Sequence, residues 1–223
     1  MFMQPAVTEN QSNTQRVYLQ LRKRIITGDL SPGQRLKVEQ IKHELDTGAS
    51  PVREALSLLT SDQLVQRLDQ RGFRVAPTSR AQFDEILTLR CTVEVLALRE
   101  SLTHGDQAWE EALVLSHHRL SKADRGDTDT FEELHKSFHM ALINACRSPI
   151  MLNFCTQLYD LNVRYRYLAG TSKGYERRDV GAEHVQILDA AIARDQDEAA
   201  QRLTEHYRNT GAFLAKMIGF DGA

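Results

Sequence analysis

The stretch that most constrains this chain is Ser50–Leu59, which reads SPVREALSLL. Ser50 is a good N-cap residue and Pro51 suits the first helical position, so the pattern predicts a helix that starts here. Four apolar residues recur at helical spacing and are expected to face a core: Val52, Ala55, Leu56 and Leu59. Arg53 would then point away from that core, near the positive end of the helix dipole. A helix start of this kind suits a polyanion, and we interpret it as one that enters the major groove of DNA.

The segments around this helix predict a small domain of three helices and a β-hairpin. Helices are expected over 14–27 and 38–45. Two short strands are expected over 64–68 and 73–76, joined by a turn in which Gly72 takes a positive φ. Three helices combined with a β-hairpin is the arrangement of a winged helix-turn-helix domain.

Two short motifs in this region carry a family resemblance. Pro51–Leu56 reads PVREAL, and Arg71–Val75, further along, reads RGFRV. They resemble the winged helix-turn-helix of the GntR family of bacterial transcription regulators. The C-terminal half resembles the FCD effector domain of the FadR-type subgroup, an all-helical bundle, and is similar to carbon-starvation and glutarate-type regulators. The resemblance implies a homodimer that binds a pseudo-palindromic, double-stranded operator with one DNA-binding domain per half-site.

The chain is expected to be mainly α-helical and to divide into parts of different kinds. Residues 1–13 are predicted to be a flexible leader, 14–76 the winged helix-turn-helix domain and 77–79 a linker. Residues 80–218 are predicted to form an all-helical antiparallel bundle, the FCD-like effector, metal-binding and dimerisation domain. Its helices are expected over 81–103, 107–124, 129–146, 150–169, 180–193 and 195–217.

Charge is unevenly distributed along the chain. The 223 residues carry a net charge of −2, which argues against indiscriminate nucleic-acid binding. Residues 1–78 hold 11 Lys and Arg against 8 Asp and Glu, a balance of +3, whereas the remainder holds 17 against 22, a balance of −5. A mildly basic N-terminal part on an acidic body is consistent with local DNA contact.

Neither a membrane span nor a signal peptide is expected. No apolar run approaches the roughly 20 residues that a span needs, and the polar N-terminus lacks a signal-peptide core. We therefore expect cytoplasmic residence. Cys91, Cys146 and Cys155 lie in apolar helical patterns and are expected to be reduced core residues.

The residues expected to contact DNA lie at the start of the helix predicted at Ser50, at the hairpin tip and just before the second helix. A helix-turn-helix uses the first residues of its second helix on base edges, and arginine suits guanine. The candidates are Arg35, Lys37, Gly48, Ser50, Arg53, Arg71 and Gly72. Arg53 could instead be a surface arginine paired with Glu54 or Asp62, and Glu54 is expected to brace the fold. Ala49 stands where many members of the family have arginine, which leaves fewer base contacts.

Histidine placement predicts a metal site in the bundle. His135 and His139 are four residues apart on one helix, a spacing at which both imidazoles can hold one divalent ion. His184 and His206 lie on the last two predicted helices, so three inward-facing helices could supply four imidazoles. Spacing alone leaves open the alternative that the pair is a solvated surface feature. The FCD resemblance implies that His139, His184 and His206 are ligands, while His135 stands where metal-binding members have an acidic residue.

The predicted metal site also suggests what it would bind. A divalent ion, zinc with nickel or manganese as alternatives, would leave open positions for the carboxylate of a small effector. Arg90, Arg164 and Arg166 are predicted to hold that anion. The alternative for Arg90 is a buried arginine paired to Glu94, one turn further along its helix.

Together these features predict a ligand-responsive transcription regulator, a repressor of a small organic acid catabolic operon, and not an enzyme. A metal-dependent helical-bundle enzyme is the alternative from another class. Against it, Lys136 stands where a zinc hydrolase helix has its catalytic Glu. Glu132 and His135 form one Glu-x-x-His of the di-iron kind, without a second copy. A DNA-binding dimer with no metabolite-sensing site is the remaining alternative.

Overall fold

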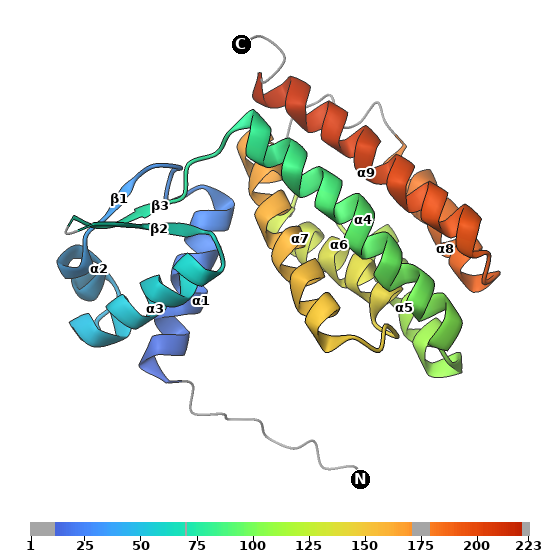
Figure 1. Ribbon diagram of the computed structural model, residues 1–223, viewed down its shortest axis with the longest axis horizontal. Coiled ribbons are helices and arrows are strands. Elements are labelled where there is room, and N and C mark those ends of the chain that lie inside the picture. The colour runs from blue at the N-terminus through green and yellow to red at the C-terminus, as the bar shows by residue number, and fades with distance from the viewer. Residues whose placement is uncertain (1–11, 70, 171–178, 220–223) are drawn as a thin grey trace. The chain divides into compact units, whose positions relative to one another are not determined.

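A computed structural model describes residues 12–69, 71–170 and 179–219 of the chain. The chain divides into two compact units, residues 1–78 and 79–223. Figure 1 shows a small sheet with helices in the first unit and a helical bundle in the second, which confirms the predicted fold class. None of the described helices is long and apolar enough to cross a membrane.

The N-terminal unit has the element order of a winged helix-turn-helix. Its elements are α1 (Asn13–Thr27), β1 (Arg35–Leu36), α2 (Val38–Glu44), α3 (Ala49–Ser61), β2 (Val65–Leu68) and β3 (Gly72–Val75). The sheet is antiparallel, with β3 between β1 and β2. Helix α1 packs on α3, and both bury apolar residues at helical spacing, such as Leu21 and Leu56. This burial holds α3 in place while Ser50 and Arg53 near its start stay exposed.

Helix α3 begins two residues earlier than predicted. Gly48 is its N-cap, with extended backbone at φ −84° and ψ 162°. The prediction that Ser50 is the N-cap is therefore wrong, because the chain turns into the helix at Gly48 and Ser50 already lies in the first turn. The Ser50 hydroxyl instead donates to Glu54 Oε1, 3.2 Å away. Pro51 is tolerated there because the first N–H groups of a helix have no intrahelical acceptor.

Helix α1 is bounded by a cap at each end. Ser12 Oγ accepts a hydrogen bond from the Gln15 N–H at 3.1 Å, and the helix starts at Asn13. Asn13 is therefore helical and not part of the predicted leader, whose residues 1–11 lie outside the described part of the chain. Gly28 ends the helix in the left-handed conformation, at φ 89°.

Strand β1 is an element of this unit that the sequence pattern does not predict. Its two residues are too few to show alternation, and it is held by antiparallel pairing with β3, where Arg35 faces Arg74. The hairpin of β2 and β3 pairs Leu68 with Gly72. Gly72 has φ +87°, which confirms that this turn uses the left-handed region that glycine tolerates.

The described chain beyond Thr78 is built of helices and their connections. They are α4 (Arg80–His104), α5 (Gln107–Ser121), α6 (Thr128–Ile143), α7 (Pro149–Ala169), α8 (Val180–Ile192) and α9 (Gln196–Ile218). Helix α4 packs against α6, α7 and α9, and α5 packs against α6 and α8 (Figure 1). This is the helical bundle that the sequence predicts.

Side-chain caps set where these helices begin. The hydroxyl of Ser79 accepts a hydrogen bond from the Gln82 N–H at the start of α4, and Ser148 does the same for Met151 at the start of α7. Helices α5, α6, α8 and α9 are capped by Asp106, Asp127, Asp179 and Asp195. Each cap satisfies an N–H group that a helix start leaves without an intrahelical partner, and contributes about 1 kcal/mol.

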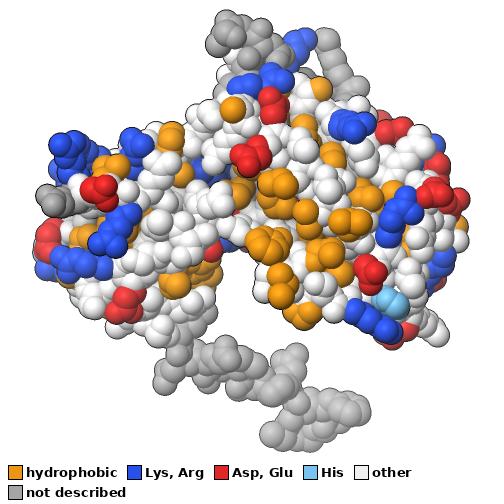
Figure 2. Space-filling view, viewed as in Figure 1, with side chains coloured by type: hydrophobic (Ala, Val, Ile, Leu, Met, Phe, Trp, Pro, Cys, Tyr) orange, Lys and Arg blue, Asp and Glu red, His pale blue; other side chains and the backbone are white. Residues whose placement is uncertain are grey.

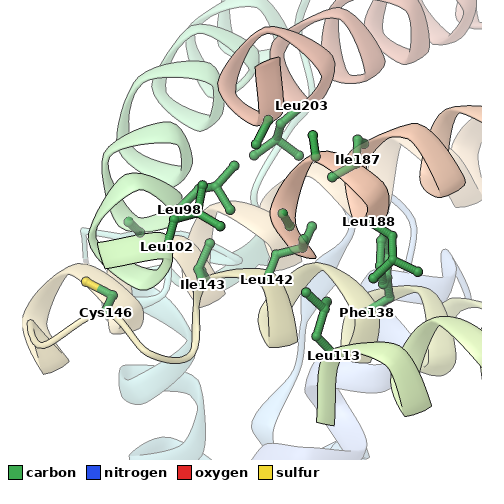
Figure 3. Close-up of a cluster of buried hydrophobic side chains, with 14 of the residues drawn as sticks. Leu98, Leu102, Leu113, Phe138, Leu142, Ile143, Cys146, Ile187, Leu188 and Leu203 are labelled. Atoms are coloured by element: carbon green, nitrogen blue, oxygen red, sulfur yellow. The ribbon is translucent and has the colours of Figure 1, made fainter. Parts of the chain in front are cut away.

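The bundle core gathers side chains from most of these helices (Figure 3). Its buried residues include Leu98, Leu113, Phe138, Leu142, Ile187 and Leu203. Phe138 directly precedes His139, and Leu203 lies one turn before His206. Truncating such residues to alanine costs about 2–5 kcal/mol, so the core holds the histidine-bearing helices firmly in register.

The three cysteines are free thiols, as the sequence predicts. Cys146 and Cys155 are buried, and Cys91 is half-buried. Burial raises the pKa of Cys155 to about 12, so its thiol stays protonated and behaves as a small apolar side chain.

Candidate functional site

Four buried histidines meet inside the bundle. His135 and His139 come from α6, His184 from α8 and His206 from α9, and none is more than 3 % exposed. One ligand nitrogen from each imidazole lies within 4.8 Å of the others. The alternative that the α6 pair is a solvated surface feature is therefore wrong. The four residues form a group that could hold a metal ion.

The two histidines of α6 are spaced as ligands of a single ion would be. Their Nε2 atoms lie 3.2 Å apart. Two nitrogens that bind one tetrahedral zinc at about 2.0–2.1 Å are separated by roughly 3.3–3.4 Å. Burial, and then the positive charge of Arg166, lowers the pKa of His135 well below its ordinary value. Burial likewise lowers the pKa of His139, so both rings are neutral near pH 7 and offer lone pairs.

A carboxylate from α8 orients His206. Glu183 Oε2 lies 2.7 Å from Nδ1 of His206, at the edge of the cluster. Because an ionised carboxylate only accepts hydrogen bonds, Nδ1 carries the proton and Nε2 keeps its lone pair. Contacts of this kind fix the ring of a metal-binding histidine and make it a stronger ligand.

Two tyrosine hydroxyls contact the outer nitrogens of the α6 pair. Nδ1 of His135 lies 2.6 Å from the Tyr159 hydroxyl, and Nδ1 of His139 lies 3.1 Å from the Tyr207 hydroxyl. Both tyrosines are buried, one on α7 and the other on α9. Sequence reasoning misses these tyrosines and Glu183, because only the packing of α7, α8 and α9 around α6 brings them to the histidines.

A small pocket lies beside the cluster. It is lined by Leu87, Arg90, His135, Asn162, Arg166, His206, Tyr207, Thr210 and Gly211. Its volume is about 10 Å³, room for roughly one water molecule. Arg90 and Arg166, two of the arginines predicted to hold an anion, therefore reach the same pocket as two of the histidines. The third, Arg164, is buried on α7 but is not among the described residues that line it.

Arg90 is ion-paired inside the bundle. Its Nε and Nη2 atoms lie 2.5 and 3.3 Å from the two carboxylate oxygens of Glu94, and Nη1 donates to Asn162 Oδ1 at 2.9 Å. Burial opposes the charge on Arg90, but the attraction of Glu94 outweighs it and raises the pKa of the guanidinium. The structure thus contains the buried Arg90–Glu94 pair that the sequence left open as an alternative, and the same arginine also lines the pocket.

Arg166 is the second cation of the pocket, and it pairs with Glu132. Its Nη2 lies 2.8 Å from Glu132 Oε1, while its Nη1 lies 3.4 Å from Nε2 of His135. Burial raises the pKa of Glu132 even though Arg166 opposes that shift. A guanidinium against the ring of His135 disfavours the imidazolium form and so helps to keep this histidine neutral.

Helices α4 and α9 come very close where they form the pocket wall. A Cβ atom built on Gly211 would lie 2.5 Å from Cδ2 of Leu87. Non-bonded carbon atoms pack at about 3.5–4.0 Å, so any side chain at 211 would push Leu87 or the helices apart. Glycine inside a helix costs about 1 kcal/mol relative to alanine, and this contact explains its use here.

All of the residues predicted to contact DNA are exposed in the N-terminal unit: Arg35, Lys37, Gly48, Ser50, Arg53, Arg71 and Gly72. Gly48, Ser50 and Arg53 lie at the start of α3, and Arg71 lies in the turn between β2 and β3. The unit therefore presents a helix N-terminus and a hairpin tip, which are the two surfaces that a winged helix-turn-helix applies to duplex DNA.

The acidic residues that could have paired with Arg53 are engaged elsewhere. Glu54 accepts a hydrogen bond from the Thr14 hydroxyl at 2.8 Å, and Asp62 accepts one from the Tyr18 hydroxyl at 2.7 Å. Glu54 thereby ties α3 to α1, which confirms its predicted bracing role. Arg53 itself is exposed.

Arg74 is a further basic residue on the sheet that the sequence pattern does not single out. It faces Arg35 across the β1–β3 pairing, and its Nε donates to Gln66 Oε1 at 3.0 Å. Like charges that face each other in a sheet repel unless an anion lies between them, so the pair suits a phosphate group. The signal that could have found Arg74 is the register of β1, which is too short to be seen in sequence.

Family models match both units of the chain. Residues 13–75 match the family described as bacterial regulatory proteins, gntR family, and residues 85–209 match the FCD domain. The uncharacterized HTH-type transcriptional regulator BphR of Paraburkholderia xenovorans (strain LB400) is 36% identical over 200 residues, 86% of this chain and 81% of that protein. The HTH-type transcriptional repressor GlaR of Escherichia coli (strain K12) is 30% identical over 197 residues, 85% of this chain and 90% of that protein.

A solved structure agrees with this assignment. The E. coli McbR/YncC chain superposes with a TM-score of 0.80 at 25% sequence identity, over 92% of this chain and 98% of that chain. These relatives are transcription regulators and not enzymes, as the sequence predicts for this protein. The chain therefore belongs to the GntR family, as a DNA-binding transcriptional regulator whose C-terminal unit is an FCD domain.

Proposed function

We propose that this regulator is a repressor of a small organic acid catabolic operon, released from its operator by a carboxylate effector. The observation that carries the proposal is the convergence of four buried histidines beside a pocket lined by Arg90 and Arg166. A divalent ion held by the four imidazoles in a five- or six-coordinate arrangement would leave coordination positions open to a carboxylate oxygen. The relative GlaR is named a repressor, which favours repression over activation here. Cytoplasmic residence, where operator DNA is found, is part of the proposal.

Zinc is the proposed metal, with nickel as the next candidate. Imidazole nitrogens suit zinc, copper, iron and nickel, whereas oxygen ligands suit magnesium, calcium and manganese. The cluster offers four imidazoles, because His135 stands where metal-binding FCD domains have an acidic residue. Manganese, the third candidate from the sequence, therefore fits these ligands less well.

The charges around the pocket favour an anionic effector. Arg90 is balanced by Glu94, and Arg166 is balanced by Glu132. Because the imidazoles are neutral ligands, these four side chains sum to zero. Counting also the carboxylate of Glu183 on His206, a divalent ion would leave the region with one excess positive charge. A carboxylate effector would be attracted by that excess in a site of low dielectric.

The pocket in this arrangement is too small for such an effector, since it has room for roughly one water molecule. Binding therefore requires a second arrangement in which the lining side chains, or the helices that carry them, move apart. Helix α4 begins at Arg80, just after the segment that leads out of the DNA-binding unit. An effector that prefers the second arrangement by about 1.4 kcal/mol shifts the equilibrium tenfold.

An exposed apolar face on the bundle supports the proposed homodimer. Figure 2 shows hydrophobic side chains gathered over α4 and α7, which pack against each other. Leu96 on α4 is 51% exposed, and Ile150 and Phe154 on α7 are 71% and 56% exposed. Apolar patches of this kind mark interaction surfaces. A second copy packed here would bring two DNA-binding units to one two-fold operator.

Operator release by carboxylates tests the proposal. An operator fragment would be selected from random duplexes by the protein itself, and binding followed by fluorescence anisotropy. Titration with succinate, malate or citrate is expected to release the fragment from Zn²⁺-loaded protein at lower concentration than from chelator-treated protein. If none of these acids releases the DNA and the protein retains no metal, the alternative of a DNA-binding dimer without a sensing site is correct.

A further inference from the structure

Tyr207 connects one histidine of the cluster to a buried carboxylate. Its hydroxyl donates to Glu94 Oε2 at 2.5 Å and lies 3.1 Å from Nδ1 of His139. All three side chains are buried. Because the hydroxyl proton goes to the carboxylate, the same oxygen must accept its other hydrogen bond from Nδ1–H of His139. This sets the tautomer of His139 and leaves the lone pair of Nε2 directed at the other histidines.

The same carboxylate is bound to a cation of the pocket wall. Both oxygens of Glu94 accept hydrogen bonds from Arg90, at 2.5 and 3.3 Å. The guanidinium carbon of Arg90 lies 4.1 Å from the centre of the Tyr207 ring, and Arg90 itself lines the pocket. A continuous set of contacts therefore runs from the pocket through Glu94 and Tyr207 to His139.

We propose that Tyr207 and Glu94 are positioning residues that prepare His139 to bind a metal ion and couple that ion to an anion at Arg90. The inference rests on the proposed metal site. An anion that accepts hydrogen bonds from Arg90 in place of Glu94 leaves Glu94 a stronger acceptor for the Tyr207 hydroxyl. The Tyr207 oxygen in turn becomes a stronger acceptor for Nδ1–H of His139. By linkage, the anion changes metal affinity by the same factor as the metal changes anion affinity.

Tyr159 offers a matched comparison on the neighbouring histidine. Its hydroxyl lies 2.6 Å from Nδ1 of His135, and the side chain is buried like that of Tyr207. Arg166 Nη1 also contacts that ring, 3.5 Å from Nδ1 and 3.4 Å from Nε2 of His135. The two tyrosines thus present the same group to the same kind of nitrogen, but the hydrogen bond to Glu94 is made by Tyr207.

Zinc affinity of the full chain, measured by competition with a chromophoric chelator, tests the coupling. Tyr207→Phe removes the hydroxyl and leaves the Arg90–Glu94 pair in place. It is expected to weaken Zn²⁺ binding about 10–100-fold, as is usual when the outer partner of a metal-binding histidine is lost. Tyr159→Phe is expected to weaken binding by a smaller factor. Equal losses in the two variants would overturn the role given to Glu94.

A double-mutant cycle supplies a readout that a purely structural role would not move. Glu94→Gln is expected to weaken Zn²⁺ binding on its own and by a smaller factor once Tyr207 is Phe, because the part carried by the hydrogen bond is then already lost and only the effect of the removed charge remains. Losses that simply add would overturn the connection. The visible spectrum of the Co²⁺-loaded Tyr207→Phe variant is expected to differ from that of the wild type, and thermal unfolding without metal confirms that the variant is folded.

The failure of this inference and the failure of the metal site are distinguishable. A wild-type chain that binds no Zn²⁺ refutes the proposed metal site itself. A wild-type chain that binds Zn²⁺ tightly, with unchanged affinity in Tyr207→Phe, refutes the coupling and leaves the metal site standing.

Discussion

Nε2 of His135 lies 3.2 Å from Nε2 of His139, in a part of the bundle where both rings are buried. Two imidazolium ions at that distance would repel strongly in a site of low dielectric, so the pair stays neutral. Metal binding needs deprotonated imidazoles, and the same neutrality favours it. The metal-free protein should therefore reveal this pair through the pH dependence of its stability.

Metal-free protein is expected to lose stability below about pH 6.5. In the unfolded chain a histidine has its ordinary pKa of about 6.5. Burial lowers the pKa of His135 and His139 in the folded protein below that value. Below that value, the unfolded chain binds protons that the folded chain does not, so the free energy of unfolding decreases as the pH is lowered. Above it, the full stability is present. Each histidine adds a slope of up to about 1.4 kcal/mol per pH unit, measurable by urea unfolding of chelator-treated protein.

The control for this prediction is His139→Gln, which keeps a polar side chain but removes one titrating ring. The pH slope of the free energy of unfolding should decrease by up to about 1.4 kcal/mol per pH unit. An unchanged slope would mean that the acid sensitivity arises elsewhere in the chain.

Replacing Arg53 with alanine should remove specific operator binding and leave the fold intact. The side chain is exposed, while Val52 and Leu56 carry the packing of α3. An arginine that reads a guanine contributes about 1–3 kcal/mol of base discrimination. Truncation of an exposed residue changes stability by less than about 0.5 kcal/mol. Anisotropy with the operator and an unrelated duplex measures the first quantity, and urea unfolding the second.

The matched variant for this test is Arg71→Ala at the hairpin tip. A residue that contacts the backbone should weaken both duplexes alike, so this variant is expected to retain the preference for the operator. Retained preference in Arg53→Ala would remove that residue from base recognition.

Arg90→Ala is expected to destabilise the whole bundle and not only the effector response. It leaves Glu94, whose side chain is 0% exposed, without its charged partner, which costs about 3–5 kcal/mol. Arg166→Ala should cost less, because the side chain of its partner Glu132 is 12% exposed. Urea unfolding of both variants compares the losses. A loss for Arg166→Ala as large as that for Arg90→Ala would contradict this reasoning.

A charge on the α4–α7 face should dissociate the proposed dimer. Phe154→Glu places a carboxylate in the apolar patch, and sedimentation velocity is expected to show a monomer. Leu115→Glu, on α5, is the comparison, since Leu115 is 47% exposed and Phe154 is 56% exposed. Dissociation by Leu115→Glu alone would place the interface on another face of the bundle.

Helix positions were predictable because their signals are local. The caps Ser79 and Asp195 and the terminator Gly28 each act within a few residues, and the helices follow them closely. The start of α3 was misplaced because Ser50 carries a good capping side chain but the backbone turns earlier, at Gly48. Strand β1 was missed because two residues carry no periodic pattern.

The candidate site was predictable only where spacing along one helix decides the matter. His135 and His139 follow from a separation of four residues, whereas His184 and His206 depended on the family resemblance as well. Tyr207 could not have been found this way, because its partners are distant in sequence and meet it only through packing of α9 on α4 and α6. For the same reason, the sequence left open whether Arg90 is paired.

The contact between Gly211 and Leu87 bears on how a filled pocket would reach the DNA-binding unit. Leu87 of α4 occupies the space that the missing side chain leaves on α9, so a shift of α9 at this contact would displace Leu87 directly. Leu87 lies about two turns after Arg80, where α4 starts. A displacement at this contact would therefore move the end of α4 that joins the preceding segment, and the size of residue 211 would determine how large that displacement must be.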